Sequence, residues 1–299
     1  MTQRNFDKSP LSSSTISRLR GLRPGSLRAY RGHGPGEQSG RSAGSGLEWR
    51  DLRPYTPGDD LRHLDWNLYA RHESLHIKER IREEAVPILI ILDDSASMSM
   101  GLPNKWDRVR ELTLALSHVA HANSSPLELF ATSAENPSRI QRFAPTARTP
   151  QQVQRWFENL EPSGLHSPAN ALKQLGSGRH RPRFTLLLTD GYEKELTPQA
   201  LRILSHRGHE ISTILIHAPE EIEPTLHGNL ELIDEETQEV EHFSITEQEV
   251  ELYRKEMSAW IQDWRQFCLE HHLKHVHHNT GTSLAQLLFQ DLIRAGILR

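Results

Sequence analysis

The strongest structural constraint in this sequence is a short apolar run that ends on a carboxylate. Residues 88–92 are all apolar and rich in β-branched side chains, and Pro87 and Asp93 bound them. Such a run predicts a strand that is buried on both faces, as in a parallel sheet. Because ligands bind beyond the carboxyl ends of such strands, Asp93, Ser95 and Ser97 fall where a site is expected.

The spacing Asp-x-Ser-x-Ser in this loop suits a hard divalent cation. Mg²⁺ prefers octahedral oxygen ligands at about 2.1 Å, keeps several waters and takes one or two carboxylates. One carboxylate and two neutral hydroxyls would leave the ion much of its charge, so it could accept a carboxylate from another molecule. We therefore expect Mg²⁺ or Mn²⁺ in a docking site that a metal ion bridges to an acidic side chain of a partner protein.

The rest of the chain alternates strand patterns with helix patterns. Strands are predicted at 75–81, 127–132, 139–143, 183–189, 210–217 and 275–278. Helices are predicted at 105–123, 149–160, 198–206, 246–271 and 283–298. This alternation predicts an α/β fold with a doubly wound, mostly parallel sheet. Residues 229–244 break the alternation and predict an antiparallel hairpin at the edge of that sheet.

A second carboxylate occupies an equivalent place in the sequence. Asp190 directly follows the predicted strand 183–189, and two strands that end on Asp in one α/β domain favour shared use of the two carboxylates. The five histidines within 271–278 have no Cys or carboxylate at ligand spacing, which favours a structural role for them.

Two motifs together carry a resemblance to a known family. Asp93-x-Ser95-x-Ser97 after a buried strand resembles the metal-ion-dependent adhesion site of von Willebrand factor A domains. Residues 46–71, which include Glu-Trp-Arg-Asp-Leu-Arg-Pro-Tyr-Thr-Pro-Gly-Asp-Asp, together with residues 93–98, resemble the bacterial von Willebrand A-like family called domain of unknown function 58. The similarity runs from about residue 30 to the C-terminus.

The resemblance implies a metal site assembled from three loops. Its expected ligands are Asp93, Ser95, Ser97, Ser167 and Asp190. Asp190 would act mostly through water, and Asp94 would point elsewhere if the loop follows the family pattern. Where von Willebrand A domains usually carry a threonine, this chain has His166 followed by Ser167. Ser167 would supply the hydroxyl if the loop shifts by one residue, whereas His166 would be a poor ligand for Mg²⁺ but would suit a transition metal. The resemblance also implies a cytoplasmic factor that works beside a MoxR-type AAA+ ATPase, in the assembly or maturation of other protein complexes.

Composition divides the 299 residues into three segments. Residues 1–45 contain eight Lys or Arg against two acids and few large apolar side chains, which predicts a disordered lead-in. A basic arm is the alternative, although aromatics for base stacking are not interleaved there. Residues 46–85 are expected to pack on the sheet of the α/β domain 86–299. One cysteine, no apolar leader and no span of about 20 apolar residues predict a cytoplasmic protein.

Segment 51–71 combines dense charge with a tryptophan. Arg and Asp at such spacing often pair, which predicts an ion-pair network that holds this segment to the sheet. The alternative is an interaction surface. Its candidate residues are Arg53, Asp59, Asp60, Arg62, Asp65, Trp66 and Arg71.

Two further functions stay open beside metal-dependent docking. The first is a magnesium-dependent phosphoryl-transfer or hydrolytic enzyme. Dehalogenase-like phosphatases need Asp-x-Asp, however, and Ser95 stands at the second position; the Gly-x-Ser-x-Gly elbow of serine hydrolases is missing as well. The second is a metal-free interaction scaffold that uses segment 51–71.

Overall fold

The computed structural model divides the chain into two compact units. The core unit comprises residues 1–26 and 86–299, and the small unit comprises residues 27–85. The structure describes residues 11–25, 49–58, 60–80, 87–134, 139–177, 183–193, 195–226, 228–233 and 240–299. Among the helices in these ranges, none combines the length and the apolar character that crossing a membrane requires.

The core unit is built on a six-stranded sheet with the strand order β10-β7-β6-β3-β4-β5. Neighbouring strands are parallel, except for the antiparallel pair β4–β5 at one edge. The predicted α/β class with a doubly wound, mostly parallel sheet is therefore confirmed. The strands are β3 Ile88–Leu92, β4 Leu127–Ala131, β5 Gln141–Phe143, β6 Phe184–Thr189, β7 Glu210–His217 and β10 Lys274–Asn279.

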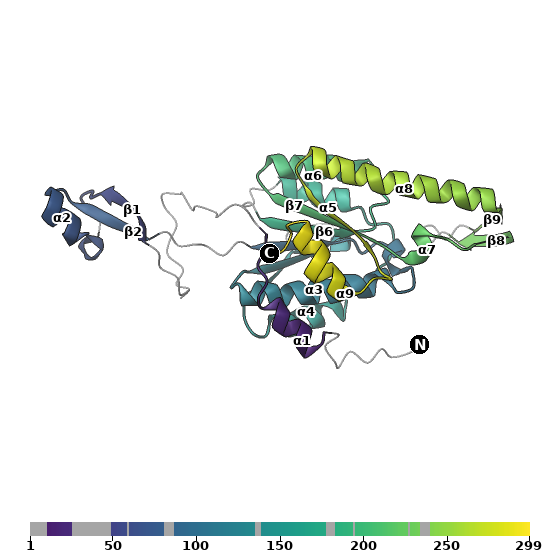
Figure 1. Cartoon of the computed structure of the whole chain (residues 1–299), viewed down its shortest axis with the longest axis horizontal. Helices are drawn as coiled ribbons and strands as arrows, with labels where there is room; N and C mark the ends of the chain where they lie inside the picture. Colours follow the sequence, from purple (N-terminus) through teal and green to yellow (C-terminus); the bar gives the residue numbers. More distant parts are fainter. Residues whose placement is uncertain are drawn as a thin grey trace. The chain divides into compact units, whose positions relative to one another are not determined.

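Helices cover both faces of this sheet (Figure 1). On one face lie α1 Ser13–Leu19, α3 Lys105–Ala122, α4 Thr149–Phe157, α9 Leu284–Gln286 and α10 Leu292–Arg294. On the other face lie α5 Pro168–Ser177, α6 Leu196–His206 and α8 Glu247–Glu270. The predicted C-terminal helix is thus divided, because a π-helical turn, Leu287–Asp291, separates α9 from α10.

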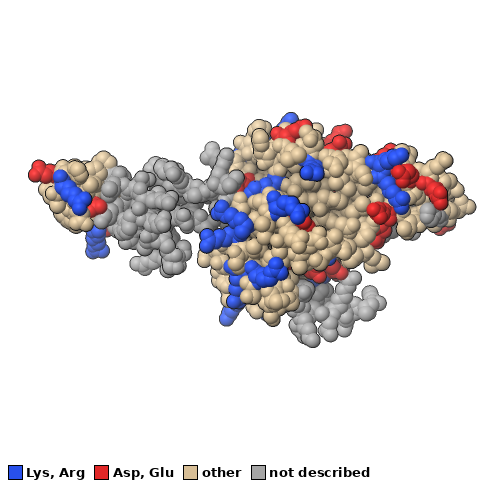
Figure 2. Space-filling model, viewed as in Figure 1, with Lys and Arg blue, Asp and Glu red and all other residues tan. Residues whose placement is uncertain are grey.

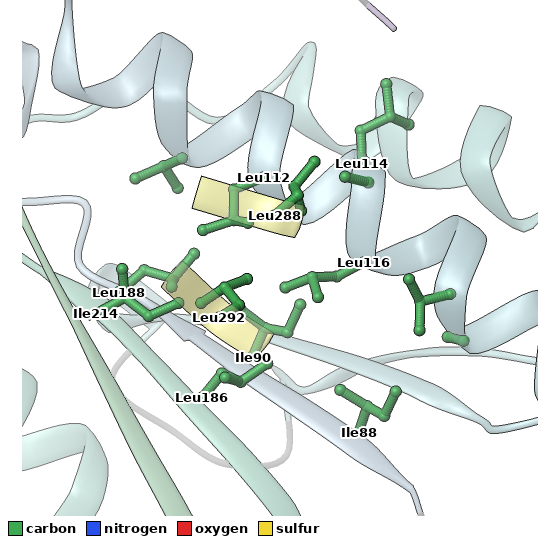
Figure 3. Close-up of a cluster of buried hydrophobic side chains, with 14 of the residues drawn as sticks. Ile88, Ile90, Leu112, Leu114, Leu116, Leu186, Leu188, Ile214, Leu288 and Leu292 are labelled. Atoms are coloured by element: carbon green, nitrogen blue, oxygen red, sulfur yellow. The ribbon is translucent and has the colours of Figure 1, made fainter. Parts of the chain in front are cut away.

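Strand β3 lies in the middle of the sheet and is buried on both sides. Ile88 and Ile90 face the layer that contains α3, whereas Leu89 and Ile91 face the layer that contains α5 and α6. Figure 3 shows Ile88 and Ile90 among leucines of α3, β6 and the C-terminal segment. The unbroken apolar run follows from this position, because no face of the strand meets water.

Truncation of a β3 side chain should therefore be costly. We predict that Ile90→Ala lowers the free energy of unfolding by about 2–5 kcal/mol, from lost burial and the cavity left behind. The matched control is Ile203→Ala on the exposed side of α6, which should change it by less than about 0.5 kcal/mol. Urea unfolding of both variants tests this, and equal losses would contradict the central position of β3.

The hairpin predicted at 229–244 forms, but its expected place at the sheet edge is wrong. Strands β8 Gly228–Ile233 and β9 Val240–Ile245 pair antiparallel with each other in a separate two-stranded sheet. The edge next to β7 is already paired with β10, the last strand of the chain. The short helix α7 Pro219–Ile222 precedes this hairpin and α8 follows it.

The prediction of a disordered lead-in over 1–45 is wrong for residues 11–25. Helix α1 begins at a Ser12 cap and packs on α3. Backbone hydrogen bonds also join Arg23 to Arg299 and Gly25 to Ile297. Three leucines anchor this segment in the core, although the surrounding sequence contains few other apolar residues: Leu11, Leu19 and Leu22. Residues 1–10 and 26–45 lie outside the described residues.

The small unit contains an antiparallel pair and one short helix. These elements are β1 Trp49–Pro54, β2 His76–Arg80, the 3₁₀ turn Leu61–His63 and α2 Trp66–His72. Leu64 and Ile77 are its buried apolar residues among those described. Whether this segment packs on the sheet of the core unit, as expected from the sequence, stays a prediction.

Candidate functional site

The site lies where β3 and β6 end side by side. These strands are parallel neighbours, although the chain passes through β4 and β5 between them. The strand order therefore reverses between β3 and β6, which is the position where open α/β sheets form a crevice for ligands. Asp93 follows β3 and Asp190 follows β6, and Asp93 N continues the pairing by donating to Leu188 O at 2.9 Å.

Short hydrogen bonds hold one serine hydroxyl against each of the two carboxylates. Ser95 Oγ donates to Asp93 Oδ1 at 2.7 Å, and Ser97 Oγ donates to Asp190 Oδ2 at 2.7 Å. The two hydroxyl oxygens lie 3.1 Å apart. Thr189 Oγ1 holds the other oxygen of Asp93, Oδ2, at 2.6 Å. Four of the five residues expected around a metal are thus brought together.

The hydroxyl hydrogens indicate where a cation would fit. Each serine hydroxyl has one hydrogen, so when both hydroxyls donate to ionised carboxylates, Ser95 Oγ and Ser97 Oγ are left with lone pairs that a cation could accept. Neighbouring ligands of an octahedral Mg²⁺ lie about 3 Å apart, since each is about 2.1 Å from the ion. The observed 3.1 Å separation matches that spacing. The donor set is all oxygen and therefore suits a hard cation.

The carboxylate of Asp93 is buried in surroundings that disfavour its negative charge. Asp93 is 3% exposed. Its burial and, next, the negative charge of Asp190 raise its pKa to about 7, against the smaller opposing effect of hydrogen bonds from Thr189 and Ser95. Among the described residues, no three His, Cys, Asp or Glu side chains gather to hold a metal ion. An ion at this site would therefore depend on the serine hydroxyls and on water.

The structure adds Lys105, which the sequence had placed only at the start of a helix. The side chain of Lys105 has no exposed surface. Its Nζ donates to Asp190 Oδ2 at 3.0 Å and to Glu221 Oε1 of α7 at 2.6 Å. Burial lowers the pKa of Lys105, but the carboxylates of Asp190 and Glu221 raise it by more, so the ammonium stays charged. No local signal marks this triad, because its members are far apart in the chain.

Histidines hold the backbone at Asp190. His217 Nε2 lies 2.9 Å from Asp190 O, and because a carbonyl oxygen only accepts, this nitrogen carries the hydrogen. His217 Nδ1 then accepts from His277 Nε2 at 3.0 Å. Burial lowers the pKa of His217 to about 4, which keeps the ring neutral. His278 contacts Arg108 at 2.9 Å. Both His277 and His278 thus have a place in the framework around the sheet.

Ser167, the fifth expected ligand, has other partners. Its Oγ donates to Glu193 Oε1 at 2.6 Å and accepts from Asn170 N at 3.2 Å, which caps the first turn of α5. The preceding loop still lies along the serine loop, since Ala96 N donates to Gly164 O at 3.0 Å. Glu193 is therefore a residue of this edge that the sequence interpretation missed, and half-buried His166 shares the loop.

Asp94 points away from the site, as expected. Its Oδ1 accepts from Thr132 Oγ1 at 2.6 Å and from Ser133 N at 2.8 Å, and its Oδ2 accepts from Ser133 Oγ. The carboxylate of Asp94 thus accepts its hydrogen bonds from the residues that follow β4. It does not supply the second acid of an Asp-x-Asp phosphatase.

In the small unit, two of the candidate carboxylates cap helices. Asp65 Oδ1 accepts from the first backbone N–H groups of α2, and Asp60 Oδ1 accepts from Arg62 N at 3.0 Å. Trp66 is 62% exposed and meets Tyr69 edge to face at 6.3 Å between ring centroids. Arg62 and Arg71 are exposed too. The side chain of Arg53 and the whole of Asp59 lie outside what the structure describes.

Fold and site define an α/β protein with a doubly wound sheet and a hydroxyl–carboxylate cluster at its switch point. Residues 51–263 match the family described as "Protein of unknown function DUF58", and the chain belongs to this family. Two mycobacterial relatives are uncharacterized protein Mb1516 of Mycobacterium bovis and uncharacterized protein Rv1480 of Mycobacterium tuberculosis. Each is 25% identical over 214 residues, which cover 70% of this chain and 67% of the relative.

Solved structures to which the chain is similar include two Bacteroides proteins and one von Willebrand factor type A protein. The conserved hypothetical protein BatB from Bacteroides thetaiotaomicron is 15% identical, with 62% of this chain and 100% of that chain covered and a TM-score of 0.36. An aerotolerance-related membrane protein from Bacteroides fragilis is 14% identical (70% and 100% covered, TM-score 0.43). The von Willebrand factor type A protein from Catenulispora acidiphila is 15% identical (71% and 42% covered, TM-score 0.38).

The raised pKa of Asp93 predicts a pH-dependent stability in the metal-free protein. The folded state retains a proton to about pH 7 that the unfolded chain releases near its ordinary pKa of 3.8. The contribution of Asp93 to the free energy of unfolding should therefore fall as pH rises between these values, by at most about 1.4 kcal/mol per unit.

Urea unfolding with EDTA between pH 5 and pH 8 measures this effect. Asp93→Asn, which stays neutral, should give a flatter pH profile than the natural chain and higher stability at pH 8. The control Asp263→Asn changes an exposed aspartate on α8 and should leave the slope as it is. Equal slopes in all three proteins would contradict the burial of an uncompensated carboxylate.

Proposed function

We propose that this chain is a non-enzymatic module that binds a partner protein through a divalent cation, Mg²⁺ or Mn²⁺. The observation that carries the proposal is the pair of serine oxygens, Ser95 Oγ and Ser97 Oγ, which lie 3.1 Å apart between two buried carboxylates. Asp93, Ser95 and Ser97 would contact the ion, and Asp190 would act through water.

Local charge supports a divalent ion. Three carboxylates, those of Asp93, Asp190 and Glu221, lie at this cluster, and the ammonium of Lys105 contacts two of them, Asp190 and Glu221. Two negative charges are left without a positive partner when all three are ionised, and buried charges of this kind are costly. A bound divalent ion would offset them and would present a positive charge to an acidic side chain of the partner.

Three residues around the proposed site would hold its carboxylates and the turn after β6 in place. Thr189 fixes one oxygen of Asp93 and leaves the other to the serine loop. His217 holds the backbone at the carboxyl end of β6, where Asp190 begins the turn. Gly191 adopts a φ of 77° in that turn, and a Cβ there would lie 2.7 Å from Leu215. Glycine therefore lets the chain leave β6 closely against the sheet.

For the partner, we propose a MoxR-type AAA+ ATPase in the assembly or maturation of protein complexes, with the chain working in the cytoplasm. The support is the resemblance of both sequence motifs to the family. Figure 2 shows both basic and acidic side chains on one face of the core unit, with the basic ones more frequent on its left half. The formal net charge of the chain is -4, which favours a protein partner over a nucleic acid.

Calorimetric titration of Mg²⁺ and of Mn²⁺ tests the metal site. We expect saturable binding by the natural chain and none by Asp93→Ala, because this substitution removes the one direct carboxylate ligand. Asp263→Ala on the surface of α8 is the matched control and should bind as the natural chain does. Absence of binding by the natural chain at millimolar ion would refute metal-dependent docking, provided that both proteins unfold cooperatively.

A second candidate is metal-free docking through the small unit, and the exposed Trp66–Tyr69 pair favours it. Exposed aromatic side chains are enriched among residues that dominate the energy of interfaces. We predict that, under this alternative, Trp66→Ala weakens capture of the ATPase by at least about tenfold in EDTA as well as in Mg²⁺. Leu75→Ala, an exposed residue of the same unit, is the control. Capture that EDTA abolishes would exclude this alternative.

A further inference from the structure

The buried ammonium of Lys105 competes for the same carboxylate oxygen that the metal proposal needs. Asp190 Oδ2 accepts from Ser97 Oγ at 2.7 Å and from Lys105 Nζ at 3.0 Å. Ser97 Oγ is in turn one of the two facing hydroxyl oxygens. A cation bound at those hydroxyls would therefore lie close to a fixed positive charge, and like charges repel strongly where water is excluded.

Lys105 also has a second carboxylate partner, Glu221, that stabilises its positive charge. Glu221 Oε1 accepts from Lys105 Nζ at 2.6 Å and from Tyr192 Oη at 3.0 Å, while Glu221 Oε2 accepts from Ala218 N at 2.6 Å. The Tyr192 ring centroid lies 5.4 Å from the ammonium, within the range of a cation–π contact. Glu221 is thus held from three sides and can keep the ammonium without Asp190.

We propose that Lys105 is an internal competitor that sets the affinity of the site for divalent cations, and that Glu221 sets how strongly it competes. This inference rests on the proposed metal site. In the metal-free chain the ammonium bridges Asp190 and Glu221, and metal binding shifts its balance toward Glu221. Lys105 is a positioning residue in this scheme, because the buried side chain contacts neither the ion nor the partner.

Two substitutions should move the metal affinity in opposite directions. Lys105→Gln keeps hydrogen-bonding capacity but removes the positive charge, so Mg²⁺ and Mn²⁺ should bind about tenfold more tightly or better. Glu221→Gln keeps a carbonyl acceptor but removes the negative charge that draws the ammonium away from Asp190. This variant should bind the same ions about tenfold more weakly. A purely structural role of the triad would weaken binding in both variants.

The experiment is calorimetric titration of Mg²⁺ and Mn²⁺ into the full chain, its two variants and a control. Lys255→Gln on α8 removes an exposed lysine that pairs only loosely with Glu251, at 3.9 Å, and should leave the affinity unchanged. Thermal unfolding in EDTA shows which variants fold. If Lys105→Gln does not fold, Glu221→Gln decides, and an affinity equal to or above that of the natural chain overturns the inference.

The outcomes separate this inference from the proposed function. Binding by the natural chain that Lys105→Gln tightens supports both. Binding that Lys105→Gln leaves equal or weakens overturns the role of Lys105 and leaves metal-dependent docking in place. Binding by Lys105→Gln alone supports the competition and overturns metal-dependent docking by the natural chain, because the lysine then closes the site. Binding by none of the proteins overturns both.

Discussion

The parallel pairing of β3 with β6 is the interaction on which the rest of the site depends. It places Asp93 and Asp190, almost 100 positions apart, at one edge of the sheet, where Asp93 N still donates to Leu188 O. The pairing is maintained by burial on both faces, since β3 packs between two layers of helices. A substitution that loosens this core would therefore change the position of one carboxylate relative to the other.

Two buried acids at one edge create a charge problem, and the chain meets it with hydroxyls and one lysine. Ser95, Ser97 and Thr189 donate hydrogen bonds, and Lys105 brings the only ammonium described at the cluster. This compensation is uneven, because Asp190 contacts the lysine whereas Asp93 does not, which is reflected in the raised pKa of Asp93. The proposed cation site and the competition by Lys105 both rest on this uneven compensation.

The parts of the site that could be predicted are those that a short stretch of sequence identifies. The Asp-x-Ser-x-Ser loop follows its strand directly, and Asp190 could be found because its strand has the same apolar pattern. Ser167 could be located in the right loop, but not its partner Glu193, because the choice between a metal and a helix cap depends on side-chain geometry. The α1 segment was missed because its few apolar residues lie among many polar and basic ones.

From sequence alone, the chain determined its α/β class, the elements of its sheet and the residues that end β3 and β6, because hydrophobic periodicity and strand-end positions are local properties. The tertiary structure decided which strands are neighbours, where the β8–β9 hairpin pairs and which charge faces Asp190. Lys105 and Glu221 come together only when α3 and α7 pack at the same edge. Long-range electrostatics of that kind has no local pattern, since it depends on distances that folding alone creates.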